Sequence, residues 1–336
     1  MDPFSRYLPA LEEEMRQAAK APTHGPSLLY GMLHYHLGWV DAEFNPVQMN
    51  AGKRLRPIFL LLACEAQDGD WHQALPAAAA VEMLHNFSLI HDDIEDRDAL
   101  RRGRTTLWRL WGEAQAINAG DTLFSLAHRA LIRLWETGLS AERVLLIQQR
   151  FTDTTIELTE GQCMDIAFET TDQVDEATYL QMVSGKTAAL ASFACEAGAL
   201  IAGAPDKRVQ ALSEFGYNLG MSFQMQDDLL GLWGDPARTG KPVGADLRQR
   251  KKTLPILHGL AYSPELQTLL AQSSLDETAI AEAQALLEET GSRAYTEQRA
   301  EAYHRKALIA LESSQGAGEA HKALYQLTQR LLNRDK

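Results

Sequence analysis

The segment His91-Asp92-Asp93-Ile94-Glu95-Asp96 places four carboxylates within five positions, directly after the apolar run Val81 to Ile90. Crowded like charges raise one another's pKa values or require cations. On a helix with 3.6 residues per turn, Asp92 and Asp96 lie one above the other on the same face. Their oxygens can share hard divalent ions, above all Mg²⁺, which prefers carboxylate, water and phosphate oxygens. A motif of this kind standing alone is more often an exposed acidic helix end.

A second acidic pair, Asp227-Asp228, interrupts another apolar helical stretch, Phe223 to Leu230. Two such pairs on separate helices, facing each other across a cavity, could hold several metal ions. Each basic residue near them is, taken singly, more often a solvated surface charge. Together, carboxylates with Mg²⁺ and a ring of Lys and Arg are what a diphosphate needs. These cations are Lys53, Arg54, Arg56, Arg101, Arg102, Lys186, Lys241, Lys251 and Lys252.

The elements that must position these residues are predicted to be helices. In Val144 to Phe168, apolar residues recur mostly three or four positions apart, whereas alternating strand patterns are scarce. Turn residues such as Gly203-Ala204-Pro205 and Asp235-Pro236 separate the helical stretches, and a further break is expected at Ser313 to Gly318. We therefore expect an all-α fold of ten or more helices, as a single domain over residues 1–336.

The composition excludes several classes of protein. Among 336 residues, 32 Lys and Arg stand against 45 Asp and Glu, a net charge of −13, which does not suit binding to nucleic acid over a broad surface. Cys64, Cys163 and Cys195 form no pattern typical of disulfides or zinc sites. We find no secretory signal and no apolar run that would span a bilayer, so the sequence predicts a soluble, cytoplasmic protein.

The motifs taken together resemble those of the trans-isoprenyl diphosphate synthases, the polyprenyl synthetase family, and in particular its short-chain geranylgeranyl and farnesyl diphosphate synthases. The resemblance implies one large helical bundle around a central cavity, of the isoprenoid synthase type, and a homodimer. The matching motifs are Gly52-Lys53-Arg54-Leu55-Arg56-Pro57, Asp92 to Asp96 with Arg101-Arg102-Gly103, Lys186-Thr187, Gln224 to Asp228, and Gly240 to Asp246 with Lys251.

The resemblance also assigns metal residues and three Mg²⁺ ions. It implies that Asp92 and Asp96 bind two ions on the allylic diphosphate, with Asp93 supporting that cluster. A third ion is expected on Asp227, with Asp228 and Asp246 acting largely through water.

The same resemblance implies two substrates and a reaction. Isopentenyl diphosphate adds head to tail to an allylic diphosphate, which is the dimethylallyl, geranyl or farnesyl compound. Metal ions and cations let the allylic C–O bond ionise, the isopentenyl double bond attacks the cation, and the departed diphosphate takes the proton. Lys186, Thr187 and Gln224 are the implied catalytic residues, Thr187 and Gln224 pointing oxygens at the cation. The allylic diphosphate is assigned Arg101, Lys186, Lys241 and Lys251, and isopentenyl diphosphate is assigned Lys53, Arg56, His85 and Arg102.

The sequence departs from the family pattern at Gly231, in the second acidic motif. Product length is expected to depend on a different position, just before the first acidic motif. Gly231 stands where the second motif usually has its last aspartate, and Asp235 is too far along to replace it. We expect activity, with changed metal affinity. The residues five and four before the first aspartate, Phe87 and Ser88, are expected to set product length. Phe87 favours a C20 product, geranylgeranyl diphosphate, with C15 farnesyl diphosphate as the alternative, unless Phe87 is ordinary core.

Three other functions compete with this one. A terpene cyclase of the same fold would ionise one diphosphate and would not need Lys53, Arg56, His85 and Arg102. A metal phosphohydrolase is suggested by His91-Asp92, but it needs further histidine ligands and leaves Asp227-Asp228 unexplained. A non-enzymatic regulatory subunit of a two-chain synthase would be expected to have decayed motifs, and these are nearly complete.

Overall fold

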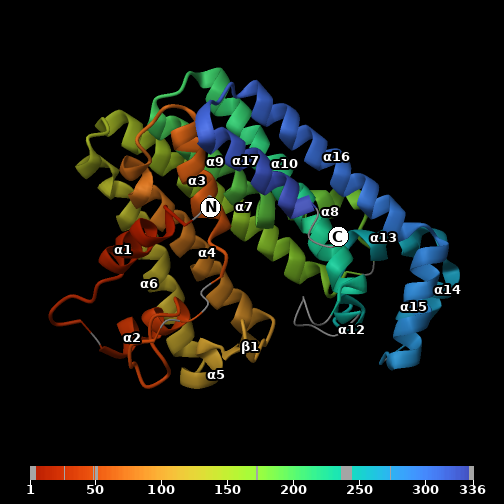
Figure 1. The fold of residues 1–336 in the computed structure, drawn as a ribbon. Helices are drawn as coiled ribbons and strands as arrows, with labels where there is room; N and C mark the ends of the chain where they lie inside the picture. Colours follow the sequence, from red (N-terminus) through yellow and green to blue (C-terminus); the bar gives the residue numbers. More distant parts are fainter. Residues whose placement is uncertain are drawn as a thin grey trace. The chain divides into compact units, whose positions relative to one another are not determined.

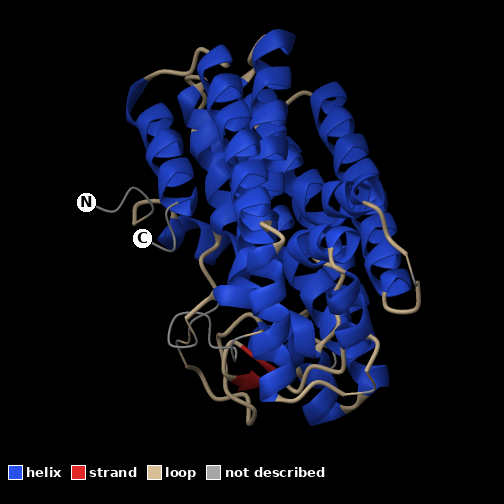
Figure 2. Ribbon diagram, turned by 90° about the vertical axis from the view of Figure 1, so that its right-hand side faces the viewer, coloured by secondary structure: helices blue, strands red, loops and turns tan. Residues whose placement is uncertain are grey.

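The computed structural model describes residues 5–25, 27–47, 49, 52–171, 173–235, 244–272 and 274–332. These residues are helical almost throughout (Figures 1 and 2). The strands among them are a short antiparallel hairpin, β1 (Leu100–Arg101) and β2 (Arg104–Thr105). The predicted all-α fold with ten or more helices is therefore confirmed.

Two compact units divide the chain. Unit 1 comprises Met1–Phe151, Ala194–Pro205 and Ala317–His321, and unit 2 comprises Thr152–Phe193, Asp206–Gly316 and Lys322–Lys336. Three of the five boundaries fall within helices, α7 (Ala141–Phe168), α9 (Ala189–Ala202) and α17 (Gly318–Leu332). The single domain expected from the sequence stays a prediction.

Unit 1 is organised by α4 (Leu75–Glu95), which packs against α1, α3 and α6. Residues Pro76 to Leu84 of α4 are all buried, because small alanines let the neighbouring helices approach from several sides. Its carboxyl end carries the first acidic motif. The other elements of this unit are α1 (Leu8–Ala18), α2 (Ser27–His36), α3 (Leu55–Ala66), η1 (Trp71–Ala74), α5 (Leu107–Trp111), α6 (Glu113–Ile132) and η2 (Arg133–Thr137).

Unit 2 is organised by α10 (Asp206–Trp233), which lies alongside α16 (Ser292–Ser313) over much of its length (Figure 1). Small residues bring the elements close together: a Cβ at Gly216 would lie 2.3 Å from the carbonyl oxygen of Ala191. α10 carries the second acidic motif. The other elements are α8 (Glu176–Val183), η3 (Ser184–Ala188), α12 (Ala245–Arg248), α13 (Leu254–Tyr262), α14 (Pro264–Leu270) and α15 (Glu277–Glu289).

Most helix boundaries agree with the sequence patterns. The periodic stretch 144–168 lies within α7, which ends at Phe168, and α9 ends just before Gly203-Ala204-Pro205. The break expected in the tail separates α16 from α17. None of the helices in the described part of the chain has the length and apolar character needed to cross a membrane.

Candidate active site

The first acidic motif ends α4 in the predicted geometry. The backbone N–H of Asp96 donates to the carbonyl oxygen of Asp92 at 2.8 Å, so the two residues lie one helical turn apart. Asp92 is partly exposed and Asp96 is exposed, whereas Asp93 is only 2% exposed. The adjacent aspartates therefore differ in environment, and only Asp92 and Asp96 are accessible to solvent.

Asp93 is held by the hairpin that follows. Arg101 Nε donates to Asp93 Oδ1 at 2.6 Å. Burial raises the pKa of Asp93 to about 6, and the charge of Arg101 opposes that rise. The hairpin turns at Arg102 and Gly103, whose φ angles are 52° and 75°, a conformation in which glycine is favoured. This accounts for the glycine of the Arg-Arg-Gly sequence and places Arg101 beside the end of α4.

Cations of the predicted isopentenyl diphosphate site gather in the same unit. Arg56 Nη1 lies 3.3 Å from His85 Nε2, and the pKa of His85 lies well below its ordinary value because of burial and the charges of Arg56 and Arg102. His85 is thus neutral and accepts from Arg56. A Cβ at Gly52, whose φ is +100°, would lie 2.6 Å from Arg102 Nη2, so the guanidinium packs against this glycine. Lys53 is exposed beside them.

One residue of the Gly52–Pro57 motif has a role that the sequence analysis missed. Arg54 is buried and donates from Nη1 to Glu82 Oε1 and from Nη2 to Glu12 Oε2, both at 3.1 Å. Glu82 is 2% exposed and also accepts from Asn86 at 2.9 Å. A charged residue within the apolar run Val81 to Ile90 was the available signal, because a buried carboxylate needs a cationic partner.

The two predicted chain-length residues face different neighbours. The Phe87 ring lies edge-on to His91, with centroids 4.7 Å apart, and tilted to Phe124 at 5.2 Å. Ser88 donates to the carbonyl oxygen of His85 at 2.8 Å. Phe87 thus belongs to a group of rings, whereas the Ser88 hydroxyl is used within its own helix.

His91 packs against α6, where its Nε2 also lies 3.7 Å from Asp121 Oδ1. A Cβ at Gly120 of α6 would lie 2.3 Å from His91 Nε2. This contact turns the imidazole towards α6. It gives no support to a histidine-based metal site of the phosphohydrolase kind.

In unit 2, Lys186 and Thr187 lie on η3, a single π-helical turn, a feature frequent at functional sites. Glycines let α7 approach this turn, since a Cβ at Gly161 would lie 2.2 Å from the backbone nitrogen of Lys186. Lys186 Nζ forms an ion pair with Asp165 of α7. Neither Asp165 nor the π-turn was anticipated, and a carboxylate four residues after Gly161 was the only sequence signal for Asp165.

Thr187 and Gln224 are joined, as the sequence analysis grouped them. Thr187 Oγ1 donates to Gln224 Oε1 at 2.9 Å, and Gln224 Nε2 donates to Asp228 Oδ1 at 3.0 Å. The other oxygen of Asp228 accepts from the Tyr179 hydroxyl at 2.6 Å and from the Leu254 backbone N–H at 3.0 Å. Burial raises the pKa of Asp228 to about 6, and the Tyr179, Gln224 and Leu254 hydrogen bonds oppose that rise.

The departure at Gly231 has a structural counterpart. A Cβ at position 231 would lie 1.9 Å from Oδ2 of Asp246, so the Asp246 carboxylate occupies the space of the missing side chain. Asp246 is buried on α12, and Asp227 is partly exposed on α10. Gly231 therefore makes room for the Asp246 carboxylate, which lies where the side chain of an aspartate at position 231 would be. The sequence analysis considered only Asp235 as a replacement and did not reveal this.

The remaining predicted substrate residues are less informative. Lys251 is exposed, and its backbone N–H donates to the carbonyl oxygen of Asp246 at 2.9 Å. Lys241 lies outside the described residues. A cavity of about 900 Å³ in unit 2 is bordered by Lys251, Lys252 and Leu254, but of the predicted site residues only Lys251 lines it. That cavity is therefore no evidence for the active site.

The donor chemistry fits Mg²⁺. The predicted metal residues that are accessible to solvent, Asp92, Asp96 and Asp227, all carry carboxylates, a donor type that suits Mg²⁺ better than sulfur or imidazole would. Within the described ranges, no three or more His, Cys, Asp or Glu residues gather closely enough to hold a metal ion by themselves. Mg²⁺ is commonly bound by one or two carboxylates that are completed by water and substrate phosphates, and each unit carries accessible carboxylates of this kind.

Comparison with known proteins places the chain in a family. Residues 39–289 match the family model described as polyprenyl synthetase. The chain is 46% identical over 247 residues to (2E,6E)-farnesyl diphosphate synthase of Mycobacterium bovis, covering 74% of this chain and 67% of that protein. It is 44% identical over 240 residues to geranylgeranyl diphosphate synthase of Mycobacterium tuberculosis, covering 71% and 67%.

A solved structure extends the similarity to the whole fold. Geranylgeranyl pyrophosphate synthase from Corynebacterium glutamicum, complexed with isoprenyl diphosphate and magnesium, matches with a TM-score of 0.85 at 27% identity, covering 98% of this chain and 99% of that one. The isoprenoid synthase type of helical fold is thereby confirmed. The chain belongs to the polyprenyl synthetase family, a family of prenyltransferases that includes the short-chain trans-prenyl diphosphate synthases.

Proposed function

We propose that the chain condenses isopentenyl diphosphate with an allylic diphosphate, and that Lys53, Arg56, His85 and Arg102 bind the isopentenyl diphosphate. The observation that carries this proposal is the cluster of Arg56, His85 and Arg102 in the unit that also holds Asp92. Cations that surround a neutral imidazole suit a diphosphate. A cyclase, which ionises one diphosphate, has no use for them.

The allylic diphosphate is assigned to the metal residues and to a second set of cations. Asp92 and Asp96 would hold two Mg²⁺ ions, and Asp227 would hold a third, with Asp228 and Asp246 reached through water. Bound Mg²⁺ would neutralise the charge that develops on the departing diphosphate. The family depends on Mg²⁺, which supports this assignment. Arg101, Lys186, Lys241 and Lys251 complete the set.

The chain's own residues orient the reaction. The ion pair with Asp165 fixes the Lys186 ammonium, which is then positioned for phosphate oxygens. Thr187 and Gln224 present oxygens towards the allylic cation, and the hydrogen bond between them supports a shared role. The proton leaves with the diphosphate, so no side chain has to act as the base.

The product is proposed to be C20 geranylgeranyl diphosphate, with C15 farnesyl diphosphate as the alternative. Phe87 packs against Phe124, and these two rings would form the floor of the space into which the growing prenyl tail extends. The relatives include enzymes named for both products. Mass spectrometry of products made from dimethylallyl, geranyl and farnesyl diphosphate separates the two lengths, because a C15 synthase would not extend farnesyl diphosphate.

The chain is also proposed to work as a cytoplasmic homodimer. Exposed apolar side chains on α6, η2 and the start of α7 support a partner on this part of unit 1. They are Ile117, Ile132, Trp135, Leu145 and Leu146. Sedimentation of the purified protein would show a mass of two chains, and a single-chain mass would overturn the dimer.

The test of the second substrate site is Arg56→Leu with Arg109→Leu as the matched control. Arg109 is exposed on α5 and is assigned no substrate. We expect Arg56→Leu to raise the KM for isopentenyl diphosphate about 10-fold or more, with a smaller change in the KM for the allylic diphosphate. An unchanged isopentenyl KM, or a product made without isopentenyl diphosphate, would contradict the proposal.

A further inference from the structure

We propose that Tyr179 is a positioning residue of the condensation, which acts through Asp228 to fix the orientation of the Gln224 amide. This inference rests on the proposed function, because it gives the Thr187 and Gln224 oxygens a role beside the allylic cation. Tyr179 does not belong to any motif that the sequence analysis singled out. Its hydroxyl nevertheless begins an unbroken series of hydrogen bonds that ends at Thr187.

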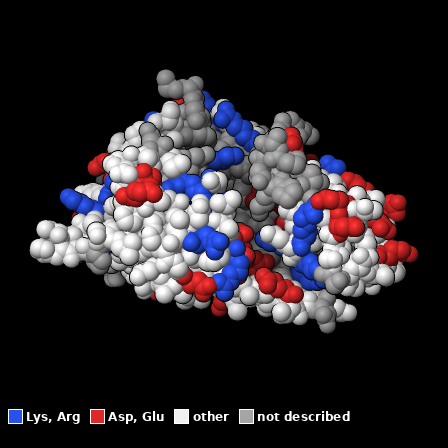
Figure 3. All heavy atoms as spheres, turned by 90° about the horizontal axis from the view of Figure 1, so that it is seen from below, with Lys and Arg blue, Asp and Glu red and all other residues white. Residues whose placement is uncertain are grey.

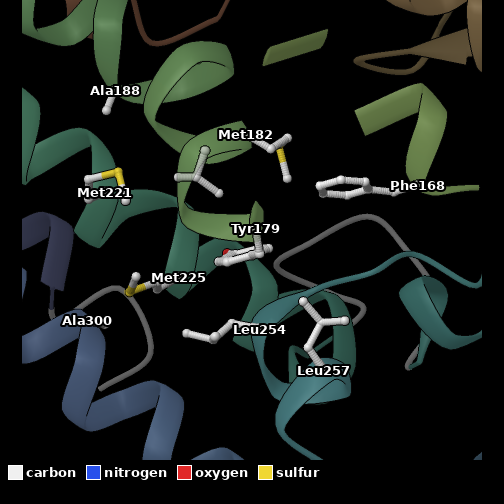
Figure 4. Close-up of a cluster of buried hydrophobic side chains, with 10 residues drawn as sticks. Phe168, Tyr179, Met182, Ala188, Met221, Met225, Leu254, Leu257 and Ala300 are labelled. Carbon is white, nitrogen blue, oxygen red and sulfur yellow. The ribbon is translucent and has the colours of Figure 1, made fainter. Parts of the chain in front are cut away.

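Tyr179 acts from a buried position. Its side chain is 1% exposed, and the ring lies among Met182, Met225 and Leu254 in the core of unit 2 (Figure 4). The phenol hydroxyl donates to the Asp228 carboxylate at 2.6 Å. A buried phenol hydroxyl normally needs such a partner, and Asp228 is the partner here.

Asp228 in turn determines how the Gln224 amide is oriented. Its Oδ1 can only accept, so it selects the Nε2 side of the Gln224 amide and turns Oε1 the other way. The Thr187 hydroxyl then donates to that Oε1. A flipped amide would present N–H groups where the proposed function needs an oxygen, and it would remove the acceptor of Thr187. The orientation of both oxygens thus depends on the position of the Asp228 carboxylate.

Among the described residues, Tyr179 is one of two donors to Oδ2 of Asp228, the oxygen that does not contact Gln224. The Leu254 N–H, at the start of α13, is the other donor to Oδ2. Loss of the Tyr179 hydroxyl leaves the Leu254 N–H as the remaining donor to Oδ2 among the described residues and lets the carboxylate rotate about its Cβ–Cγ bond. The consequence reaches Gln224, which is assigned to the allylic cation and to neither diphosphate, so the main effect is expected in kcat rather than in KM.

The chain offers a matched control. Tyr295 also donates its hydroxyl to a carboxylate of unit 2, that of Glu176, which in turn pairs with Arg299 at 2.7 Å. That series does not include Gln224. Tyr295→Phe therefore removes the same chemical group and the same kind of hydrogen bond without disturbing the amide.

The experiment measures kcat, both KM values and the unfolding temperature for Tyr179→Phe, Tyr295→Phe, Gln224→Leu and the double variant Tyr179→Phe/Gln224→Leu. We expect Tyr179→Phe to lower kcat about 10-fold with both KM values within about 2-fold of wild type. Tyr295→Phe should stay within about 2-fold in all three constants. In the Gln224→Leu background, Tyr179→Phe should change kcat less than about 2-fold, because the residue through which it acts is gone.

Tyr179→Met serves as a second replacement, since it fills the core without the hydroxyl and should show the same loss confined to kcat. Additive losses in the double variant, or an equal loss in Tyr295→Phe, would overturn the role of Tyr179 and leave the proposed function intact. A wild-type protein that forms no prenyl diphosphate would overturn the proposed function itself. The two failures are therefore distinguishable.

Discussion

The two acidic motifs lie in different units, and their buried aspartates are stabilised by different kinds of partner. Each has one buried aspartate beside a more accessible one: Asp93 beside Asp92 in unit 1, and Asp228 beside Asp227 in unit 2. Asp93 is neutralised by a cation, Arg101, whereas Asp228 is held by a phenol, an amide and a backbone N–H. We propose that in each adjacent pair the buried carboxylate positions its neighbours and the accessible one contacts the ligand.

The different roles of the accessible and the buried carboxylates are tested by replacing one of each. Asp92→Asn should lower kcat about 10³-fold, because it weakens charge stabilisation in the transition state, and should leave the unfolding temperature near that of wild type. Asp93→Asn should lower the unfolding temperature, since Arg101 loses its anionic partner. Steady-state kinetics and thermal melts of both variants test the division, and a larger kinetic loss in Asp93→Asn would contradict it.

Glu82 is a second buried carboxylate of unit 1 that is paired with a cation, Arg54, and it tests whether such pairing stabilises the unit. Arg54→Met should cost about 3 kcal/mol of unfolding free energy, because it leaves the Glu82 carboxyl group buried without its cationic partner. The double variant Arg54→Met/Glu82→Met should recover most of that loss. Urea unfolding measures both values. If the single variant is as stable as wild type, the buried ion pair has no structural role.

In unit 2, Gly231→Asp should destabilise the protein by about 2 kcal/mol, because the new carboxylate enters space that Asp246 already fills and adds a like charge. Gly231→Ala isolates the steric part and should cost less. Thermal melts without Mg²⁺ give the stability, and Mg²⁺-induced shifts of the melting temperature give the metal affinity. A stabilised Gly231→Asp with tighter Mg²⁺ binding would show that the glycine merely lost a ligand.

A smaller expected effect concerns product length. Phe87→Ala should lengthen the product by at least one C5 unit, since it removes a ring from the group that includes Phe124. Ser88→Ala is the control, because the hydroxyl is bonded within its own helix. Mass spectrometry of the products decides the matter, and an unchanged product distribution in Phe87→Ala would place the floor elsewhere.

The smallest expected effect is a change in the pH dependence of stability, and it comes from the buried histidine His304. Burial lowers the pKa of His304 on α16, Glu301 opposes this only in part, and Nε2 has no hydrogen-bond partner among the described residues. The native state therefore favours neutral His304, and its contribution to stability is lost as the pH falls below its unfolded pKa of about 6.5. Melting temperatures at pH 7.5 and 5.5 should differ less in His304→Gln than in wild type. An equal difference would contradict this account.

The sequence predicted the helices and the pairings along them better than the pairings between them. Periodicity placed α7, and helical spacing placed Asp92 and Asp96 one turn apart. The partners that contact across elements were missed, such as Asp165 for Lys186. Spacing along one helix fixes its own geometry, whereas the meeting of two helices depends on small residues such as Gly161, which only three-dimensional packing reveals.

The distribution of charge also could not be predicted from the sequence composition. The net charge of −13 describes the whole chain and excludes a broadly basic surface. The structure nonetheless has basic and acidic side chains side by side on the face seen in Figure 3. The cations near His85 come from Arg56, before α4, and Arg102, after it. Composition could not have predicted that local balance, because it contains no information on which distant residues meet.

The most direct test of the account is to follow incorporation of ¹³C-labelled isopentenyl diphosphate with farnesyl diphosphate as the starter and Mg²⁺ present. The account predicts a C20 diphosphate that carries the label, and no turnover of farnesyl diphosphate when isopentenyl diphosphate is left out. An unlabelled hydrocarbon or alcohol released from farnesyl diphosphate alone would contradict it. That result would mean that the cations around His85 do not bind a second substrate.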